Sequence, residues 1–301
     1  MGLEHDTRVL LTGATGLIGR QVRRLLEEQV ELYVVSRNPP ATGAARWLAF
    51  DLSLPGAAAE LVWKHRPEVI IHLAGAVRGD RSLDAIQPTL GANLLATVEL
   101  LEAATRAGVR RIVTSGSLLE EPASGGSMVT PPSPYGASRW ASSAYARMFH
   151  ALFATPVVIL RPSYAYGPGQ DETKLFPHVI TNALQGERAL LASGERRLDF
   201  VYSEDVGRAY VAAATAVGVE GETIDIGSGE LVRVRDAIDA MLDLLENAPR
   251  PDFSSERGRP FEQELRVDTG VAERLLGWHA STSLTEGLRR TVDWYARRGA
   301  E

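Results

Sequence analysis

The chain has 301 residues, of which 45% are hydrophobic and 23% are charged, and its formal net charge is −6. These are the values of an ordinary soluble globular protein, and the acidic balance argues against a general nucleic-acid binder. Cysteine is absent, which excludes disulfides, thiolate catalysis and zinc–thiolate sites, and the six histidines form no close metal-ligand pair. No apolar run approaches the roughly 20 residues that span a bilayer, and the first residues lack a signal-peptide pattern. We therefore expect a cytoplasmic protein with no metal and no membrane partner.

Short β-branched runs alternate along the chain with helical patterns, which predicts βαβ units and a mostly parallel sheet. The expected strands are, in chain order, residues 8–12, 31–36, 46–51, 69–73, 111–114, 157–160 and 223–226. Apolar residues at i, i+3 and i+4 predict packed helices at 21–28, 92–107 and 138–153. We therefore expect an α/β fold with a Rossmann-type doubly wound parallel sheet.

The rhythm of strands and helices loosens beyond residue 160. Irregular stretches begin at Gly167-Pro168-Gly169 and again at residue 248, and they predict a smaller C-terminal substrate-binding lobe. The strand at 223–226 returns to the sheet in between. The expected dinucleotide-binding domain is residues 1–165, with 220–245 returning to it, and the expected lobe is residues 166–219 and 246–301.

A glycine-rich loop with the spacing G-x-x-G-x-x-G joins the first strand to the first helix. Glycine lets the backbone turn tightly and approach a pyrophosphate, which then rests on the helix N-terminus. Its place between a strand and a helix of an α/β chain predicts a dinucleotide site. The expected contacts are Gly13, Thr15, Gly16, Leu17, Ile18 and Gly19.

The end of the second strand bears on the choice of cofactor. NAD enzymes usually place an Asp or Glu there to bond the ribose 2′-hydroxyl, whereas this chain has Ser36-Arg37. An arginine can pair with the 2′-phosphate of NADP, so NADP(H) is favoured and NAD(H) is possible. Asp51 and Leu52, which follow the third strand, are expected near the adenine, although Asp51 could equally cap the next turn.

A tyrosine and an arginine are spaced one helical turn apart at Tyr135 and Arg139, and Ser115 follows a strand-like run. Free tyrosine has a pKa of about 10 and is a poor acid–base catalyst near neutrality. A cation one turn away lies on the same face of the helix and stabilises the phenolate. With a hydroxyl nearby in the fold, this pair indicates redox chemistry at a carbonyl group.

With these motifs in order, the sequence resembles the extended short-chain dehydrogenase/reductase family, which contains nucleotide-sugar epimerases, dehydratases and ketoreductases. The resemblance covers nearly the whole chain. The matching motifs are the loop at 12–19, Ile71-His72-Leu73-Ala74-Gly75, Asn93-Leu94-Leu95-Ala96-Thr97, Ser115, Tyr135, the segment 161–169, and the closing segments 275–278 and 284–288.

The resemblance implies that Ser115 and Tyr135 are catalytic residues and that Arg139 acts with them. In the family, the counterparts of helices 92–107 and 138–153 pair two subunits, so a homodimer is implied as well. The further cofactor contacts that the resemblance implies are Leu73, Ala74, Gly75, Asn93, Tyr135, Arg139 and Pro162.

Departures from the family pattern bear on function. Arg139 stands in place of a lysine, and because arginine is bulkier and planar, weakened catalysis, a shifted ribose contact or a pseudoenzyme are all open. We expect activity, and we expect Arg139→Lys to preserve or raise turnover. Gly116 and Ser117 stand where sugar 4,6-dehydratases carry an Asp–Glu pair, which disfavours a dehydratase.

The substrate side shows a further departure, since Leu198 replaces an arginine that holds the nucleotide diphosphate in the family. Neighbouring arginines are expected to take its place. The expected substrate contacts are Ser115, Ser117, Tyr164, Asn182, Arg197 and Arg259.

These features together favour an NADPH-dependent oxidoreductase that reduces the keto group of a nucleotide-linked 4-keto-6-deoxy sugar. Ser115 would bond the carbonyl oxygen, Tyr135 would deliver the proton, and Arg139 would tune the tyrosine and position the ribose. One alternative is an NAD-dependent nucleotide-sugar 4-epimerase, which would use the same three residues. Another is a non-catalytic dinucleotide-binding protein.

Overall fold

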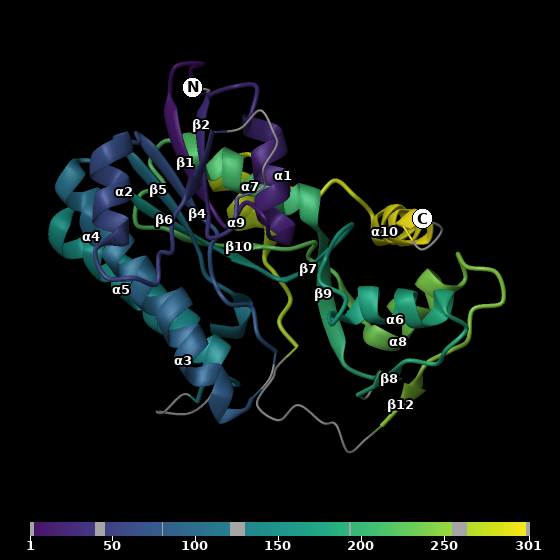
Figure 1. Cartoon of the computed structure of the whole chain (residues 1–301). Coiled ribbons are helices and arrows are strands. Elements are labelled where there is room, and N and C mark those ends of the chain that lie inside the picture. The colour runs from purple at the N-terminus through teal and green to yellow at the C-terminus, as the bar shows by residue number, and fades with distance from the viewer. Residues whose placement is uncertain are drawn as a thin grey trace.

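The computed structural model describes residues 3–39, 46–79, 81–120, 130–192, 194–254 and 264–298. Within these ranges the chain forms a large α/β part and a smaller lobe beside it (Figure 1). None of the helices in the described ranges has the length and apolar content that crossing a bilayer requires.

The large part is built on a sheet of seven strands among the described residues, in the order β10-β6-β5-β4-β1-β2-β3, and every neighbouring pair is parallel. The strands are β1 (Arg8–Thr12), β2 (Glu31–Ser36), β3 (Arg46–Ala49), β4 (Val69–His72), β5 (Arg111–Ser115), β6 (Val157–Pro162) and β10 (Thr223–Ile226). Each begins at its predicted residue and ends within two residues of its predicted end. The Rossmann-type sheet is therefore confirmed. The strands β4 and β5 are buried along their whole length, as parallel strands covered on both faces must be.

Helices cover both faces of this sheet and divide its core in two. One face packs α1 (Leu17–Leu26), α7 (Ser203–Thr215) and α9 (Thr269–Leu276), and the other packs α2 (Ala57–His65), α4 (Ala96–Ala107) and α5 (Pro134–Phe153) (Figure 1). Side chains alternate along each strand. Val113 of β5 therefore faces α7, whereas Ile112 faces α4 and α5.

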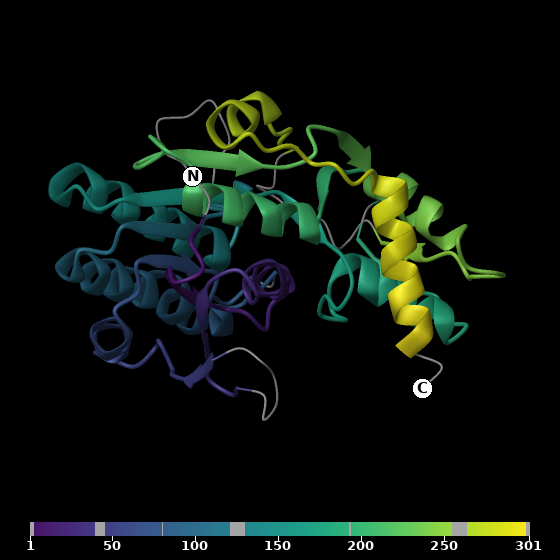
Figure 2. The same cartoon turned by 90° about the horizontal axis from the view of Figure 1, so that it is seen from above.

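The smaller lobe has its own sheet and its own core. Its three-stranded sheet has the order β11-β9-β7, and a short parallel pair joins β8 to β12. The elements are β7 (Tyr164–Tyr166), β8 (Leu190–Leu191), β9 (Arg197–Tyr202), β11 (Leu231–Arg233), β12 (Asp252–Phe253), α6 (Leu175–Leu184), α8 (Val234–Leu242) and α10 (Leu284–Arg298). Figure 2 shows α10, in yellow, running beside this lobe and away from the helices of the large part.

The domain boundaries remain a prediction, but two helices pack in a different core from the one that these boundaries assign to them. The helix α7 falls within the range expected for the lobe, yet its residues Val206, Ala209 and Ala213 belong to the core of the large sheet. The helix α8 falls within the range expected to return to the sheet, yet Ile238 and Met241 lie in the core of the lobe. The chain therefore crosses between the two cores more often than the sequence suggested.

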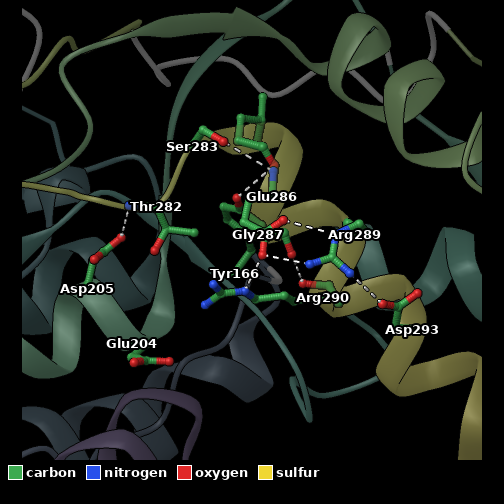
Figure 3. A network of polar contacts seen from close by, with 12 residues as sticks. Tyr166, Glu204, Asp205, Thr282, Ser283, Glu286, Gly287, Arg289, Arg290 and Asp293 are labelled. Carbon is green, nitrogen blue, oxygen red and sulfur yellow. Dashed lines mark hydrogen bonds and ion pairs between the residues drawn. The ribbon is translucent and has the colours of Figure 1, made fainter.

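The C-terminal segment crosses from the large part to the lobe and is anchored by the network in Figure 3. The buried Asp205 carboxylate of α7 accepts the Thr282 N–H at 3.0 Å. The Ser283 hydroxyl accepts the Glu286 N–H at 3.3 Å at the start of α10, and Glu286 pairs with Arg289 and Arg290. An ideal Cβ at Gly287 would lie 2.1 Å from the Tyr166 hydroxyl oxygen, so only glycine lets α10 approach β7 this closely.

Candidate active site

The three predicted catalytic residues meet where β5 ends and α5 begins. Pro134 opens α5, and the Ser133 hydroxyl caps it by accepting the Gly136 N–H at 3.1 Å. This places Tyr135 and Arg139 in the first turns of the helix, with the Arg139 Cζ 5.7 Å from the centre of the tyrosine ring. The Arg139 Nη1 donates to the Ser115 carbonyl oxygen at 2.9 Å. All three residues are buried.

The hydroxyl of Ser115 is held by a residue that the sequence did not single out. The Ser115 Oγ lies 2.7 Å from the Tyr210 hydroxyl of α7 and 3.5 Å from the His72 carbonyl oxygen. Burial raises the pKa of Tyr210, so its phenol stays neutral. Strand alternation offered a signal for this contact, because Ser115 lies two residues after Val113 and faces α7 as Val113 does.

Beyond the strand, Ser117 lies in a tight turn closed by Glu120. The Glu120 carboxylate accepts the Ser117 N–H at 2.6 Å, and the Ser117 Oγ accepts the Leu119 N–H at 3.2 Å. Burial raises the pKa of Glu120, and hydrogen bonding, with smaller effects from the Arg161 and Arg139 charges, offsets this only in part. An ideal Cβ at Gly116 would lie 2.5 Å from a Glu120 oxygen, so the carboxylate occupies the space that glycine leaves. No motif in the sequence indicated that Glu120 folds back here.

Asn93 ties the loop after β4 to the helix that carries Tyr135. It lies in a π-helical segment, Leu90–Leu95, of a kind often found at functional sites. Its Oδ1 accepts the Ala76 N–H at 2.7 Å, and its Nδ2 donates to the Ala76 carbonyl at 3.1 Å and to the Ser138 Oγ at 2.9 Å. The Ser138 hydroxyl in turn donates to the Tyr135 carbonyl at 2.9 Å. Asn93 therefore fixes the position of this part of α5.

His72 is a packing residue at the end of β4. Its Nδ1 lies 2.8 Å from the Thr12 Oγ1 and its Nε2 lies 3.0 Å from the Thr97 Oγ1. Burial, with a smaller effect from the Arg139 charge, lowers the pKa of His72 to about 3. In the described ranges no three His, Asp or Glu side chains gather closely enough to hold a metal ion.

The glycine loop has the shape that a pyrophosphate requires. Gly13 has φ +72°, and an ideal Cβ there would lie 2.5 Å from the Ala74 nitrogen, while one at Gly19 would lie 2.1 Å from the Gly13 carbonyl oxygen. Gly16 is exposed, and α1 begins after it with no side-chain cap and no acid in its first turn. The first N–H groups of α1 thus fit an anion. The other predicted contacts of the loop, Thr15, Leu17 and Ile18, lie at the same helix start.

At the far edge of the predicted cofactor site, Arg37 is exposed at the end of β2, beside Ser36. The Asp51 carboxylate accepts the Ser53 N–H at 3.0 Å and the Ser53 hydroxyl at 2.7 Å, so Asp51 does cap the following turn. These hydrogen bonds, and then the Arg37 charge, lower the pKa of Asp51. Leu52 is buried beneath that turn.

The predicted substrate contacts are brought together only in part. Tyr164 lies at the start of β7 against Arg196, whose Cζ is 5.4 Å from the tyrosine ring centre and whose guanidinium bonds the hydroxyl. Arg197 is instead exposed and paired with Glu264 at 2.9 Å. Asn182 bonds its own helix, with its Nδ2 donating to the His178 carbonyl at 2.8 Å. Arg259 lies outside the described residues.

The motif departure at Leu198 has a packing reason. Leu198 is buried in the core of the lobe, among Phe200 and Val234, so its side chain cannot reach a ligand. Strand alternation along the segment that enters β9 leaves Arg196 beside Tyr164. The arginine next to the predicted sugar contact is therefore Arg196, two residues before the leucine.

Known proteins resemble the chain over nearly its whole length. Residues 9–227 match the family model described as the NAD dependent epimerase/dehydratase family. A UDP-glucose 4-epimerase of Mycolicibacterium smegmatis is 30% identical over 97% of this chain and 99% of its own. The dTDP-glucose 4,6-dehydratase 1 of Escherichia coli is 26% identical over 96% of this chain and 92% of its own.

Solved structures agree with these relatives. MoeE5 in complex with UDP-glucose and NAD is 30% identical, with a TM-score of 0.86 over 98% of this chain and 100% of that chain. The UDP-glucuronic acid 4-epimerase from Bacillus cereus, at 24% identity and a TM-score of 0.86, covers 96% of this chain and 99% of its own and shows the shared fold. On the match of residues 9–227 and the 30% identity over nearly the full length, the chain belongs to the NAD dependent epimerase/dehydratase family, within the extended short-chain dehydrogenase/reductases.

Proposed function

We propose that this protein is an NAD-dependent 4-epimerase of a nucleotide-linked sugar. The observation that carries the proposal is the meeting of Tyr135 and Arg139 with the Ser115–Ser117 turn, beside a glycine loop shaped for a dinucleotide. The sequence favoured a ketoreductase, but an epimerase and MoeE5, which was solved with UDP-glucose and NAD, are both 30% identical to this chain. These two proteins support the epimerase, which was the alternative function in the sequence analysis.

The residues present fit a dinucleotide at two places. The uncapped start of α1 at Gly16 would receive the pyrophosphate. At the other end, the buried Arg139 Nε has no hydrogen-bond partner among the described residues, and a buried donor of this kind costs about 1–3 kcal/mol unless a ligand satisfies it. When bound, NAD supplies the hydride acceptor and donor for the sugar C4.

The chain's own residues handle the proton at the sugar oxygen. Tyr135 takes the proton of the 4-hydroxyl and returns it after the ring has presented its other face. The Arg139 guanidinium lies beside this tyrosine as a fixed positive charge, 5.7 Å from the centre of the ring. A hydroxyl of the Ser115–Ser117 turn donates to the same oxygen. Ser115 is the donor expected from the sequence, but its hydroxyl already forms a hydrogen bond with the Tyr210 hydroxyl. Ser117 is therefore the second candidate for this donor.

The nucleotide side of the substrate would lie against the smaller lobe. Tyr164 and Arg196 offer a hydroxyl and a guanidinium next to each other, which suits a diphosphate or a sugar hydroxyl. We keep Tyr164, Asn182 and Arg197 as proposed substrate contacts, and we add Arg196. A dehydratase stays disfavoured, because the Glu120 carboxylate beside Gly116 is bonded to the Ser117 backbone.

A second candidate is the NADPH-dependent ketoreductase, and Arg37 is the observation in its favour. No acid follows β2, and the Arg37 charge contributes to the lowered pKa of Asp51, so this end of the cofactor site carries an exposed cation. Such a cation suits a 2′-phosphate better than a free ribose hydroxyl.

We also propose a homodimer through α5. Large apolar side chains on this helix are exposed, which is unusual for a surface that stays in water. They are Trp140, Tyr145, Leu152 and Phe153.

The test is to denature the purified protein, identify any released dinucleotide, and assay the intact protein with UDP-glucose. Stoichiometric NAD that resists exchange, with interconversion of the C4 epimers and no net cofactor consumption, is the expected result. An empty protein that prefers NADPH and consumes it with 4-keto sugars would establish the reductase instead. Cofactor binding without turnover on either substrate would establish the non-catalytic alternative.

A further inference from the structure

The cation of the active site is enclosed more tightly than its position on a helix requires. Arg139 is 2% exposed, and its Nη1 is fixed by the Ser115 carbonyl at 2.9 Å. Its guanidinium lies over the ring of Tyr135. A planar group with five N–H donors in a rigid fork needs a flat slot, whereas a lysine ammonium is a compact point charge.

Gly75 forms one wall of this slot. An ideal Cβ at Gly75 would lie 2.3 Å from the Arg139 Nη2, 3.2 Å from its Cζ, and 2.6 Å from the Asn93 Oδ1. The φ angle of Gly75 lies outside the left-handed region, so the backbone itself does not call for glycine. The guanidinium therefore occupies the space where a side chain at position 75 would stand.

The neighbours of Gly75 cannot easily give way. The Asn93 side chain is fully buried and makes hydrogen bonds to both the N–H and the carbonyl of Ala76, which follows Gly75 directly. Arg139 is held at its other end by Ser115. A methyl group at position 75 would consequently push the guanidinium out of its place before it moved the loop.

We propose that Gly75 is a positioning residue whose missing side chain makes a seat for a guanidinium, so that Gly75 and Arg139 work as a matched pair. The pair rests on the proposed function, since it concerns the same site. Arg139 is then a residue that the site is shaped to hold, and its presence in place of lysine does not indicate a loss of catalytic activity. A lysine ammonium would not fill the flat slot and would leave a void against Gly75, so the proposal predicts that Arg139→Lys lowers turnover, contrary to our expectation from the sequence that it preserves or raises turnover.

The experiment is a double-mutant cycle on the full-length protein with Gly75→Ala, Arg139→Lys and their combination. Three quantities are measured: the NAD retained per chain after purification, the melting temperature, and kcat with UDP-glucose. Each single variant should lose kcat by about 10-fold or more, because small displacements of catalytic groups cost factors of this order. In the Arg139→Lys background, Gly75→Ala should cost at least about threefold less kcat than it does beside Arg139, or restore retained NAD, since pairs in contact are not additive. The Asn93 contact is common to both backgrounds and cancels.

Gly91→Ala is the matched control, because, apart from its chain neighbours and the backbone of its own helical segment, no heavy atom of the described residues lies within 4 Å of an ideal Cβ there. It should leave kcat and retained NAD unchanged in both backgrounds and should not lower the melting temperature, since alanine stabilises a helical position relative to glycine. Equal costs of Gly75→Ala in the two backgrounds, or an Arg139→Lys protein with full NAD retention and turnover, would overturn the matched pair. If the unmodified protein fails to convert UDP-glucose, the proposed function fails, while the cycle in retained NAD and melting temperature still decides the pair.

Discussion

The large sheet and the smaller lobe are held together by different kinds of contact. In the sheet, successive residues of one strand serve two cores, so that Leu10 faces one helix layer and Leu11 the other. In the lobe, aromatic rings from distant segments pack edge to face, with Tyr166 against Phe176 at 5.2 Å and against Tyr202 at 5.8 Å between ring centres. The first kind of core follows from local periodicity, and the second depends on which distant segments meet.

A buried carboxylate lies where the two regions join. Asp199 of β9 accepts hydrogen bonds from the Ser228 N–H at 2.7 Å, the Ser228 hydroxyl at 2.9 Å and the Gly229 N–H at 2.9 Å. The Gly227-Ser228-Gly229 segment after β10 is thus a turn that wraps around an acid of the lobe. The comparison predicts that removing a functional side-chain group in the sheet region lowers kcat, whereas removing one in the lobe weakens substrate binding.

The largest effect should come from Tyr135→Phe. Removing the proton carrier should lower kcat about 100-fold or more while the retained NAD is unchanged, because general acid–base groups contribute factors of this size. Steady-state kinetics with UDP-glucose and the dinucleotide content measure both. The lobe supplies the matched control: Tyr295→Phe removes a hydroxyl that donates to the Gln170 carbonyl, and it should keep kcat. Full turnover in Tyr135→Phe would refute the assignment.

The two serines of the β5 turn should separate chemistry from packing. Replacing the serine that contacts the substrate with alanine should lower kcat about 10- to 100-fold. If Ser117 is that residue, Ser115→Ala should chiefly reduce stability by about 1–3 kcal/mol, because the buried Tyr210 hydroxyl loses its partner. Urea unfolding and kcat are measured for both variants. Equal kcat losses, with no loss of stability in Ser115→Ala, would contradict this division.

The buried imidazole of the sheet region should make the protein less stable in mild acid. His72 has a pKa of about 3 in the folded state, against about 6.5 when unfolded. Between these values the unfolded chain binds a proton that the folded chain does not, so stability falls as the pH drops below about 6.5, by up to about 1.4 kcal/mol per pH unit. The free energy of unfolding is measured from pH 7 to pH 5. A His72→Gln variant with the same pH slope would show that other groups cause it.

The smallest effect should come from the lobe. Tyr164→Phe removes a hydroxyl that lies against Arg196, and it should raise KM for the nucleotide sugar about 3- to 10-fold, which corresponds to the net contribution of one ordinary hydrogen bond. The value of kcat should stay within about twofold, since Tyr164 lies in the smaller lobe against Arg196 and not with the proposed catalytic residues. A loss of kcat at constant KM would place Tyr164 in the chemistry and erase the contrast between the two regions.

The sequence by itself determined the seven strands of the main sheet, the glycine loop and the tyrosine–arginine spacing. Each of these follows from residues close together in the chain: alternation along a strand, glycine at a tight turn, and one helical turn between Tyr135 and Arg139. The family followed from the order of those local motifs. They did not fix the cofactor preference or the reaction, because an epimerase and a ketoreductase would use the same three residues.

Only the tertiary structure decided which distant groups meet. Tyr210 reaches Ser115 across 95 residues of sequence, and Gly75 borders the Arg139 guanidinium from a different strand end. The tertiary structure also places the Glu120 carboxylate in the space beside Gly116. It places Arg196, rather than Arg197, against Tyr164. These contacts depend on how helices cover a sheet and how two cores are joined, and no periodicity along the chain encodes them.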